Sequence, residues 1–218
     1  RVGAATGDGV FGDFDVQQDV ARKPEPAPLP EALPEECIWL DGGQNYIVCA
    51  FYTPNYLAQV LNLKASLDAL GLNYCLKRYE RRATWEATTR LKPVFLDSVL
   101  ARFPKHNVVY VDADAVIRAP LKFFDQVTAD VSFLIHEAHA RGRRYLRLAS
   151  GTVFVRNSDG GRKFAQAWKA QEAKSSALTL DEDMIYMAFG EVEGVTFAVL
   201  PKAYCKIFDR PGEGGIIE

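Results

Sequence analysis

A ten-residue stretch at positions 108–117, VVYVDADAVI, combines a short apolar run with two carboxylates, Asp112 and Asp114. Apolar residues continue on both sides, so the pattern predicts a buried strand with acidic residues at its carboxyl end. In an open α/β sheet, ligands bind just outside the carboxyl ends of the strands. Two carboxylates there need a positive partner, and a divalent metal is expected because hard cations take oxygen ligands. A surface turn with two solvated aspartates is the alternative.

The segments before this stretch alternate between strand-like and helix-like patterns. Apolar runs of strand length are followed by residues at helical spacing, and the stretch at 108–117 contains the third strand of the series. This order predicts an α/β fold, a single domain with a mostly parallel central sheet flanked by helices. The strands are expected at 46–52, 72–77 and 108–111, and the helices at 57–70 and 91–102.

The second half of the chain has a more mixed pattern. Asp181 stands at the start of the last helical pattern, where an aspartate is a good N-cap. Strands are expected near 131–135, 152–155 and 195–200, and helices at 162–173 and 181–189.

The first 35 residues differ in composition from the remainder. Residues 23–34 read KPEPAPLPEALP, and five prolines in twelve residues exclude a regular helix and favour an extended linker. We therefore expect an N-terminal arm with a proline-rich linker at 1–35 and one folded domain at 36–218.

Composition narrows the functional classes. The formal net charge of -2 gives no general argument for binding nucleic acid or a membrane surface. No apolar run approaches the roughly 20 residues of a membrane span. The four cysteines form no CxxC pair, so a zinc site is poorly supported, and a reducing, cytoplasmic location is expected.

Basic and aromatic residues precede the acidic stretch. Pro93 fixes the first turn of the helix at 91–102, which places Lys92 at the helix N-terminus. A lysine there opposes the helix dipole at a cost of about 0.3–1 kcal/mol unless an anion lies nearby. We expect Lys92, with Arg90 close to it, to face a diphosphate, and a solvated lysine is the alternative. Trp85 either stacks on a ligand or packs as the anchor of a lid.

The first strand ends in Phe51 and Tyr52, and Thr53 opens the following helix. Aromatic surface beside the N–H groups of a helix N-terminus is suited to a base and a phosphate. Core aromatics at a strand end are an equally good interpretation.

Two further groups lie downstream. Ser150, Gly151 and Thr152 are small residues that allow close approach of a substrate to the backbone. Arginines crowd the segment before them and form either a solvated face or a site for a polyanionic acceptor; they are Arg141, Arg143, Arg144 and Arg147. Asp181, Glu182 and Asp183 fit either the first turn of a helix or the roles of base, nucleophile and sugar-hydroxyl ligand.

Together these pieces resemble the GT-A glycosyltransferases of the glycogenin-like and plant-type nucleotide-diphospho-sugar transferase groups. The resemblance covers about residues 46–209. Its pieces are YIVCAFYTPNY (46–56), the segment from Trp85 to Lys92, VVYVDADAVI (108–117), ASGTVFVRN (149–157), LDEDMI (180–185) and LPKAY (200–204).

The resemblance implies a Rossmann-like GT-A domain. It also implies a metal-dependent hexosyl- or pentosyltransferase that moves a sugar from a nucleoside-diphosphate sugar, with UDP expected, to an acceptor. In such enzymes an Asp-x-Asp motif binds Mn²⁺, or Mg²⁺, and the ribose, which here implicates Asp112, Ala113 and Asp114. The other donor-binding positions that it implies are Phe51, Tyr52, Thr53, Trp85, Arg90 and Lys92. The sugar and acceptor side falls on Ser150, Gly151 and Thr152, with Asp181, Glu182 and Asp183 as the catalytic candidates.

The chain departs from this family at one position. Many relatives supply a third metal ligand, often a histidine, near the C-terminus, but no histidine follows His139 and Asp209 is the candidate substitute. One alternative is a haloacid-dehalogenase-like phosphatase with Asp112 as nucleophile, since its first motif is also an apolar strand ending in DxD. The other is a non-catalytic sugar- or metal-binding domain.

Overall fold

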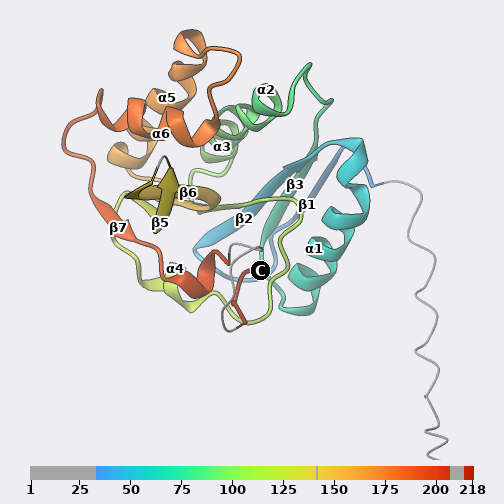
Figure 1. The fold of residues 1–218 in the computed structure, drawn as a ribbon. Helices are drawn as coiled ribbons and strands as arrows, with labels where there is room; N and C mark the ends of the chain where they lie inside the picture. Colours follow the sequence, from blue (N-terminus) through green and yellow to red (C-terminus); the bar gives the residue numbers. More distant parts are fainter. Residues whose placement is uncertain (1–32, 141, 207–213) are drawn as a thin grey trace, which may run out of the picture.

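The computed structural model describes residues 33–140, 142–206 and 214–218. Seven strands form one mixed sheet in the order β1-β3-β2-β4-β6-β5-β7 (Figure 1). The strands are β1 (Glu36–Trp39), β2 (Tyr46–Tyr52), β3 (Tyr74–Arg78), β4 (Asn107–Val111), β5 (Val131–Ala140), β6 (Arg143–Val155) and β7 (Phe197–Val199). The helices are α1 (Leu57–Ala69), α2 (Trp85–Thr89), α3 (Leu91–Arg102), α4 (Lys122–Gln126), α5 (Asp159–Ala170) and α6 (Asp181–Phe189), with short 3₁₀ turns η1 (Pro54–Tyr56), η2 (Gln171–Lys174) and η3 (Lys202–Tyr204).

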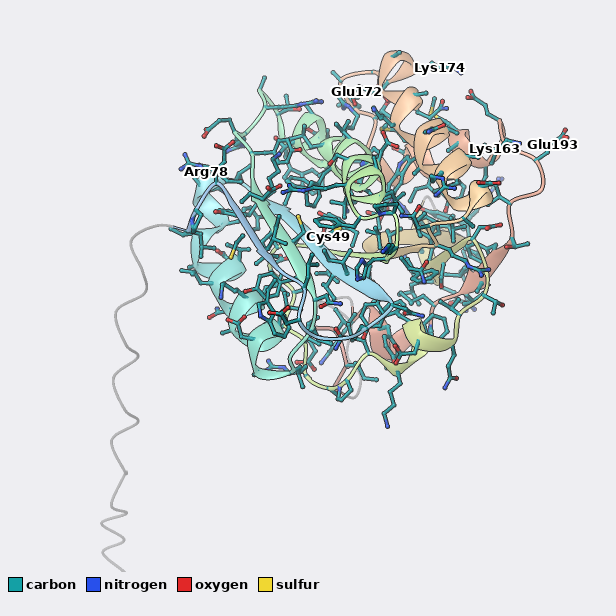
Figure 2. The ribbon with its side chains drawn as sticks, turned by 180° about the vertical axis from the view of Figure 1, so that it is seen from behind. Cys49, Arg78, Lys163, Glu172, Lys174 and Glu193 are labelled. Carbon is teal, nitrogen blue, oxygen red and sulfur yellow. The ribbon has the colours of Figure 1, made fainter. Side chains whose placement is uncertain are left out.

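Helices cover both faces of the sheet, as the strand–helix alternation predicts. Strand β2 pairs in parallel with β3 and β4, and β7 pairs in parallel with β5, whereas β1, β4 and β5 make antiparallel pairs. All seven residues of β2 are buried. Its alternate residues enter two separate cores, one beneath α1 and α4 and the other beneath α3, α5 and α6. Cys49 points into the second of these, in the middle of the sheet (Figure 2).

The Asp-Ala-Asp stretch lies at the carboxyl edge of β4, where β6 passes in the opposite direction. Val111 pairs with Thr152, and the N–H of Asp112 donates to the carbonyl of Gly151 at 2.9 Å. On its other side β6 carries an irregularity, because Phe133 pairs with Val153 whereas the next residue, Leu134, pairs with Ala149. Residues 150–152 therefore form a bulge that faces the end of β4, an arrangement common beside active sites.

The long hairpin of β5 and β6 is the main difference from the predicted elements. The strands expected at 131–135 and 152–155 run instead from 131 to 140 and from 143 to 155, so Ser150, Gly151 and Thr152 lie within a strand. The arginine-rich segment lacks apolar alternation, and cross-strand pairing with β5 makes it a strand. Strand β1 and the short helices α2 and α4 were not predicted either, because each is too short to show a period.

The other predicted segments either agree more closely with the structure or lie outside the described residues. The arm predicted at 1–35 lies almost entirely outside the described residues. Helix α5 begins at Asp159, earlier than predicted, because Ser158 caps it by accepting the N–H of Gly161. Among the described residues, no helix has the length and apolar character that crossing a membrane requires.

The carboxylate of Asp130, directly before β5, forms hydrogen bonds to the residues that precede α5 and β7. Its ionisation should therefore make the stability of the fold depend on pH. Its carboxylate accepts the Ser158 hydroxyl and both the N–H and the hydroxyl of Thr196. Partial burial raises the pKa of this carboxyl, but the hydrogen bonds outweigh burial and hold the pKa below the ordinary value. A lowered pKa stabilises the fold above the unfolded-state value of about 4 and loses this effect as the pH falls through the folded-state value.

We therefore expect Asp130→Asn to lower the unfolding free energy by about 1–2 kcal/mol at pH 7. The difference from the parent should shrink as the pH falls below about 4 through the lowered folded-state pKa of Asp130, as measured by urea unfolding at a series of pH values. Asp159→Asn, at a fully exposed side chain in the first turn of α5, is the control. A deficit that is constant with pH would contradict the ionic role of Asp130.

Candidate functional site

The buried ammonium group of Lys92 is the centre of the candidate site. Lys92 is the second residue of α3, and only 4% of its side chain is exposed. Its Nζ lies 3.1 Å from Oδ1 of Asp112 and 2.8 Å from Oδ2 of Asp181. It also donates to the carbonyl and the hydroxyl of Ser150, at 2.9 and 3.0 Å. One cation thus joins α3, the end of β4, the bulge of β6 and the start of α6.

The electrostatics of this cation exclude the solvated-lysine interpretation. Burial alone lowers the pKa of Lys92, but the carboxylates of Asp112 and Asp181 outweigh burial and raise it above the ordinary value. A buried lysine with two carboxylate partners is charged, and removing it would leave those partners uncompensated.

Tyr110 belongs to the same cluster, although the motifs did not point to it. Its hydroxyl donates to Oδ1 of Asp112 at 3.2 Å, and Nζ of Lys92 lies 4.9 Å from its ring centroid. Tyr110 stands two residues before Asp112, so the two share one face of the strand, and this spacing was a signal available in the sequence. We call Lys92, Tyr110, Asp112, Ser150 and Asp181 the Lys92 cluster.

Asp112 and Asp114 differ in their surroundings. Loss of solvation at the sheet edge raises the pKa of Asp112, Lys92 opposes this shift, and the nearby carboxylates of Asp181 and Asp114 add to it. Ala113 is buried, whereas Asp114 is exposed and forms no ion pair with any described lysine or arginine. Lys92 with its partners Asp112 and Asp181, and with Asp114 beside Asp112, carries a formal charge of -2, counted as three negative charges and one positive.

This donor set suits a hard divalent cation in charge and in chemistry, since all its ligating atoms are carboxylate oxygens. It supplies only part of a ligand shell. The described residues contain no group of three or more histidine, cysteine, aspartate or glutamate side chains arranged to hold a metal. Asp209, the predicted third ligand, lies outside the described residues.

The three acids at the start of α6 have three different environments. Asp181 is the first helical residue rather than the N-cap predicted for it, because Leu180 holds the cap position and Lys92 draws the Asp181 side chain inward. Asp183 is half exposed and accepts the N–H of Leu180 at 3.0 Å, so it has the capping function. Glu182 lies between them and faces β6.

Glu182 connects the predicted arginine segment to the Lys92 cluster. Its Oε2 lies 2.7 Å from Nε of Arg147, and its Oε1 accepts the N–H of Ser150 at 3.4 Å. Two of the four arginines proposed to bind a polyanion are thus already paired, Arg147 with Glu182 and Arg144 with Glu137. Arg143 is exposed, and Arg141 lies outside the described residues.

The bulge of β6 packs closely against Asp112. A Cβ added to Gly151 would lie 3.3 Å from Oδ2 of Asp112 and 3.6 Å from Sγ of Cys205, so a glycine is favoured there. Ser150 and Thr152 on either side are buried. Cys205 was not among the predicted site residues, and burial raises the pKa of its thiol.

The aromatic residues predicted to bind the base lie in the core. The Phe51 ring packs against Tyr79, Phe95 and Tyr110, and the Tyr52 hydroxyl points to the carbonyl of Pro34. Thr53 is also buried and donates to the Asn55 side chain. These positions follow from the burial of β2 on both faces, and they agree with the core-aromatic interpretation.

Two further predicted donor residues lie apart from the Lys92 cluster. The guanidinium of Arg90 binds Glu172 and the carbonyls of Ser176 and Thr179, so it secures the loop between η2 and α6. Figure 2 shows Glu172 and Lys174 together in this outer part of the molecule. Trp85 begins α2 and is 56% exposed, which leaves its ring free to stack on a ligand.

Comparison with known proteins agrees with this architecture. Residues 71–214 match the nucleotide-diphospho-sugar transferase family. A glycosyltransferase involved in glycosylation of the major capsid of PBCV-1 has a similar fold, with a TM-score of 0.57, 12% sequence identity, and coverage of 74% of this chain and 84% of that one. The glycosyltransferase GlyE of Streptococcus pneumoniae TIGR4 gives a TM-score of 0.52 at 13% identity, over 74% of this chain and 46% of that one.

The family match spans about two thirds of the chain and includes Lys92, Asp112, Asp114, Ser150 and Asp181. A search of curated proteins finds no match to the chain. The match is to a transferase family, and it favours neither the phosphatase nor the non-catalytic binding domain. The chain therefore belongs to the nucleotide-diphospho-sugar transferase family and is a glycosyltransferase with a GT-A-like fold.

Proposed function

We propose that this glycosyltransferase uses a UDP-sugar as donor and depends on Mn²⁺ or Mg²⁺. The observation that carries the proposal is the Lys92 cluster together with Asp114, which places carboxylate oxygens with a formal charge of -2 (three aspartates and one lysine) at the carboxyl edge of β4. In this proposal Asp112 and Asp114 hold the cation. When bound, the cation neutralises the negative charge that develops on the leaving nucleoside diphosphate.

The proposed reaction is a substitution at the anomeric carbon. The acceptor oxygen forms a bond to that carbon, the bond from the carbon to the diphosphate oxygen breaks, and the acceptor proton passes to a base. Lys92 is already engaged by Asp112, Asp181 and Ser150, so we assign it a positioning role that fixes these groups before the donor binds.

Among the three acids of α6, Glu182 is the best candidate for a direct catalytic role. Lys92 neutralises Asp181, and Asp183 caps the helix. Glu182 pairs with Arg147, but its side chain is 22% exposed against 6% for Asp181, and it contacts the bulge through the N–H of Ser150. Its carboxylate can therefore face a sugar or an acceptor hydroxyl beside the Lys92 cluster.

The base of the donor needs a surface other than Phe51 and Tyr52, since both are buried. A pocket of about 570 Å³ lies at the carboxyl end of β3, on the same edge of the sheet as Asp112. Its lining residues are Glu35, Lys77, Arg78, Tyr79 and Glu80, and Arg78 pairs with Glu80 at 2.9 Å. The two cations are balanced by two carboxylates, so nothing there favours a phosphate. The Tyr79 ring and the carboxylate acceptors suit a base and ribose hydroxyls, so we place the nucleoside of the donor towards that pocket.

Donor hydrolysis tests the proposal without knowledge of the acceptor. The chain would be incubated with a panel of UDP-, GDP- and ADP-sugars, with Mn²⁺, with Mg²⁺ or with EDTA. We expect slow release of UDP from at least one UDP-sugar, dependent on the metal. Equal hydrolysis in EDTA would contradict metal dependence, and turnover of only the GDP- or ADP-sugars would contradict the UDP assignment.

Tyr110→Phe provides a finer test of the cluster. It removes one of the two donors to Oδ1 of Asp112 and leaves the ring beneath Lys92, so donor hydrolysis should fall by roughly tenfold with a loss of about 1 kcal/mol in stability. Tyr74→Phe is the matched control, because the Tyr74 hydroxyl donates to Asp68 in the same way at 3.0 Å. Equal hydrolysis rates in the two variants would show that Tyr110 does not position Asp112.

A further inference from the structure

An apolar groove lies between the β5–β6 hairpin, α6 and β7. Its volume is about 440 Å³, and its apolar and aromatic lining includes Ile135, Leu146, Leu148, Tyr186, Phe189 and Phe197. Leu146, Tyr186 and Phe197 leave 68%, 44% and 38% of their surface exposed. Clustered exposure of such side chains is typical of a binding surface, and no other described segment covers this one.

The groove is continuous with the candidate site through α6. Glu182, Tyr186 and Phe189 are four and then three residues apart, so they follow one face of that helix. Strand β6 pairs with β4 only from Thr152 to Val155. In the part of β6 before Thr152, side chains on this face of α6 accept hydrogen bonds from the backbone N–H groups. Leu148 N–H donates to the Tyr186 hydroxyl at 2.6 Å, and Ser150 N–H donates to Glu182.

The charges in the lining of the groove indicate whether an anionic or an uncharged ligand would bind there. Arg147 is the charged side chain in its lining, and the Glu182 carboxylate already pairs with it. An anionic occupant would have to compete with Glu182 for this guanidinium. An uncharged apolar occupant fills the same space without disturbing the pair, and the volume falls within the roughly 300–1,000 Å³ of small-molecule sites.

We propose that this groove binds the apolar part of an amphiphilic acceptor, a hydroxyl compound with an alkyl or aryl group, such as an alkyl glycoside. The apolar part lies against Leu146, Tyr186 and Phe197, and the hydroxyl end reaches Glu182 beside the Lys92 cluster. The inference rests on the proposed function and adds the chemical class of the acceptor. It replaces the polyanionic acceptor that the arginine segment indicated.

The test compares octyl β-glucoside with methyl β-glucoside, both below the micelle concentration, on the full chain. Binding is measured by saturation-transfer NMR without donor, and transfer by mass spectrometry with the UDP-sugar that the chain hydrolyses. Burial of a few methylenes predicts that octyl β-glucoside binds at least about tenfold more tightly.

Leu146→Asp and Phe197→Ser should each remove most of the difference between the two glucosides. Leu178→Asp should retain it, because Leu178 is 81% exposed and lies outside the groove.

Equal binding of the two glucosides to the parent chain would overturn the inference, as would retention of the preference in both groove variants. Preferential transfer to glucose 6-phosphate over octyl β-glucoside would also overturn it and favour an anionic acceptor. Because the NMR measurement needs no donor, failure of the proposed function is seen separately, as absence of UDP-sugar hydrolysis while octyl β-glucoside still binds in the groove.

Discussion

Lys92→Met should lower the unfolding free energy by about 3–5 kcal/mol and abolish donor hydrolysis. The substitution keeps the length of the side chain but removes the charge that compensates Asp112 and Asp181. Asp181 should account for more of this loss than Asp112. Only 6% of the Asp181 side chain is exposed, so its uncompensated carboxylate cannot regain its hydration. Unfolding in urea can be followed through Trp168, which is buried and donates to the Asp181 carbonyl.

Two companion variants separate charge compensation from general damage. Lys169→Met breaks the exposed pair between Lys169 and Asp97, which should cost at most about 1 kcal/mol. Adding Asp181→Asn to Lys92→Met removes the uncompensated buried charge, and we expect it to restore part of the lost stability but not the activity. A loss below 1 kcal/mol in Lys92→Met would show that Lys92 is not the partner of these carboxylates in solution.

The sequence predicted those parts of the fold and site that have a local signal. The strand–helix series up to Val111 shows clear periodicity, and the bounds of β2, α3 and β4 agree closely with the predictions. Pro93 placed Lys92 at the start of α3, and the apolar run before Asp112 placed the acids at a strand end. Each conclusion depends on residues only a few positions apart, where pattern and propensity agree.

The parts that could not be predicted depend on contacts between distant segments. The arginine segment became strand through pairing with β5, and Arg147 found Glu182 35 positions away. Phe51 and Tyr52 were equally compatible with a ligand or the core until both covering layers of β2 were known. Likewise, Lys92 could be expected to meet an anion, but only the folded chain shows that Asp112 and Asp181 are that anion.

The second large effect concerns Asp114. In the parent, UDP with Mn²⁺ at about 100 times the dissociation constant should add about 2.7 kcal/mol, which corresponds to a rise in melting temperature of roughly 5–10 °C. Asp114 is exposed and has no described ion-pair partner, so Asp114→Ala should alter the stability of the free protein little. The same substitution should abolish the rise produced by UDP with Mn²⁺, because it removes one of the two proposed metal ligands.

Asp41→Ala is the control for this experiment, since Asp41 is also exposed but lies before β2, at the opposite edge of the sheet from the end of β4. It should leave the ligand-induced rise intact. An undiminished rise in Asp114→Ala would remove Asp114 from the metal site and leave Asp112 as its only described ligand. Because Lys92 already neutralises part of the charge on Asp112, a single shared carboxylate would hold a divalent cation weakly. That outcome would therefore shift the proposed neutralisation of the diphosphate from a metal to the protein's own cations.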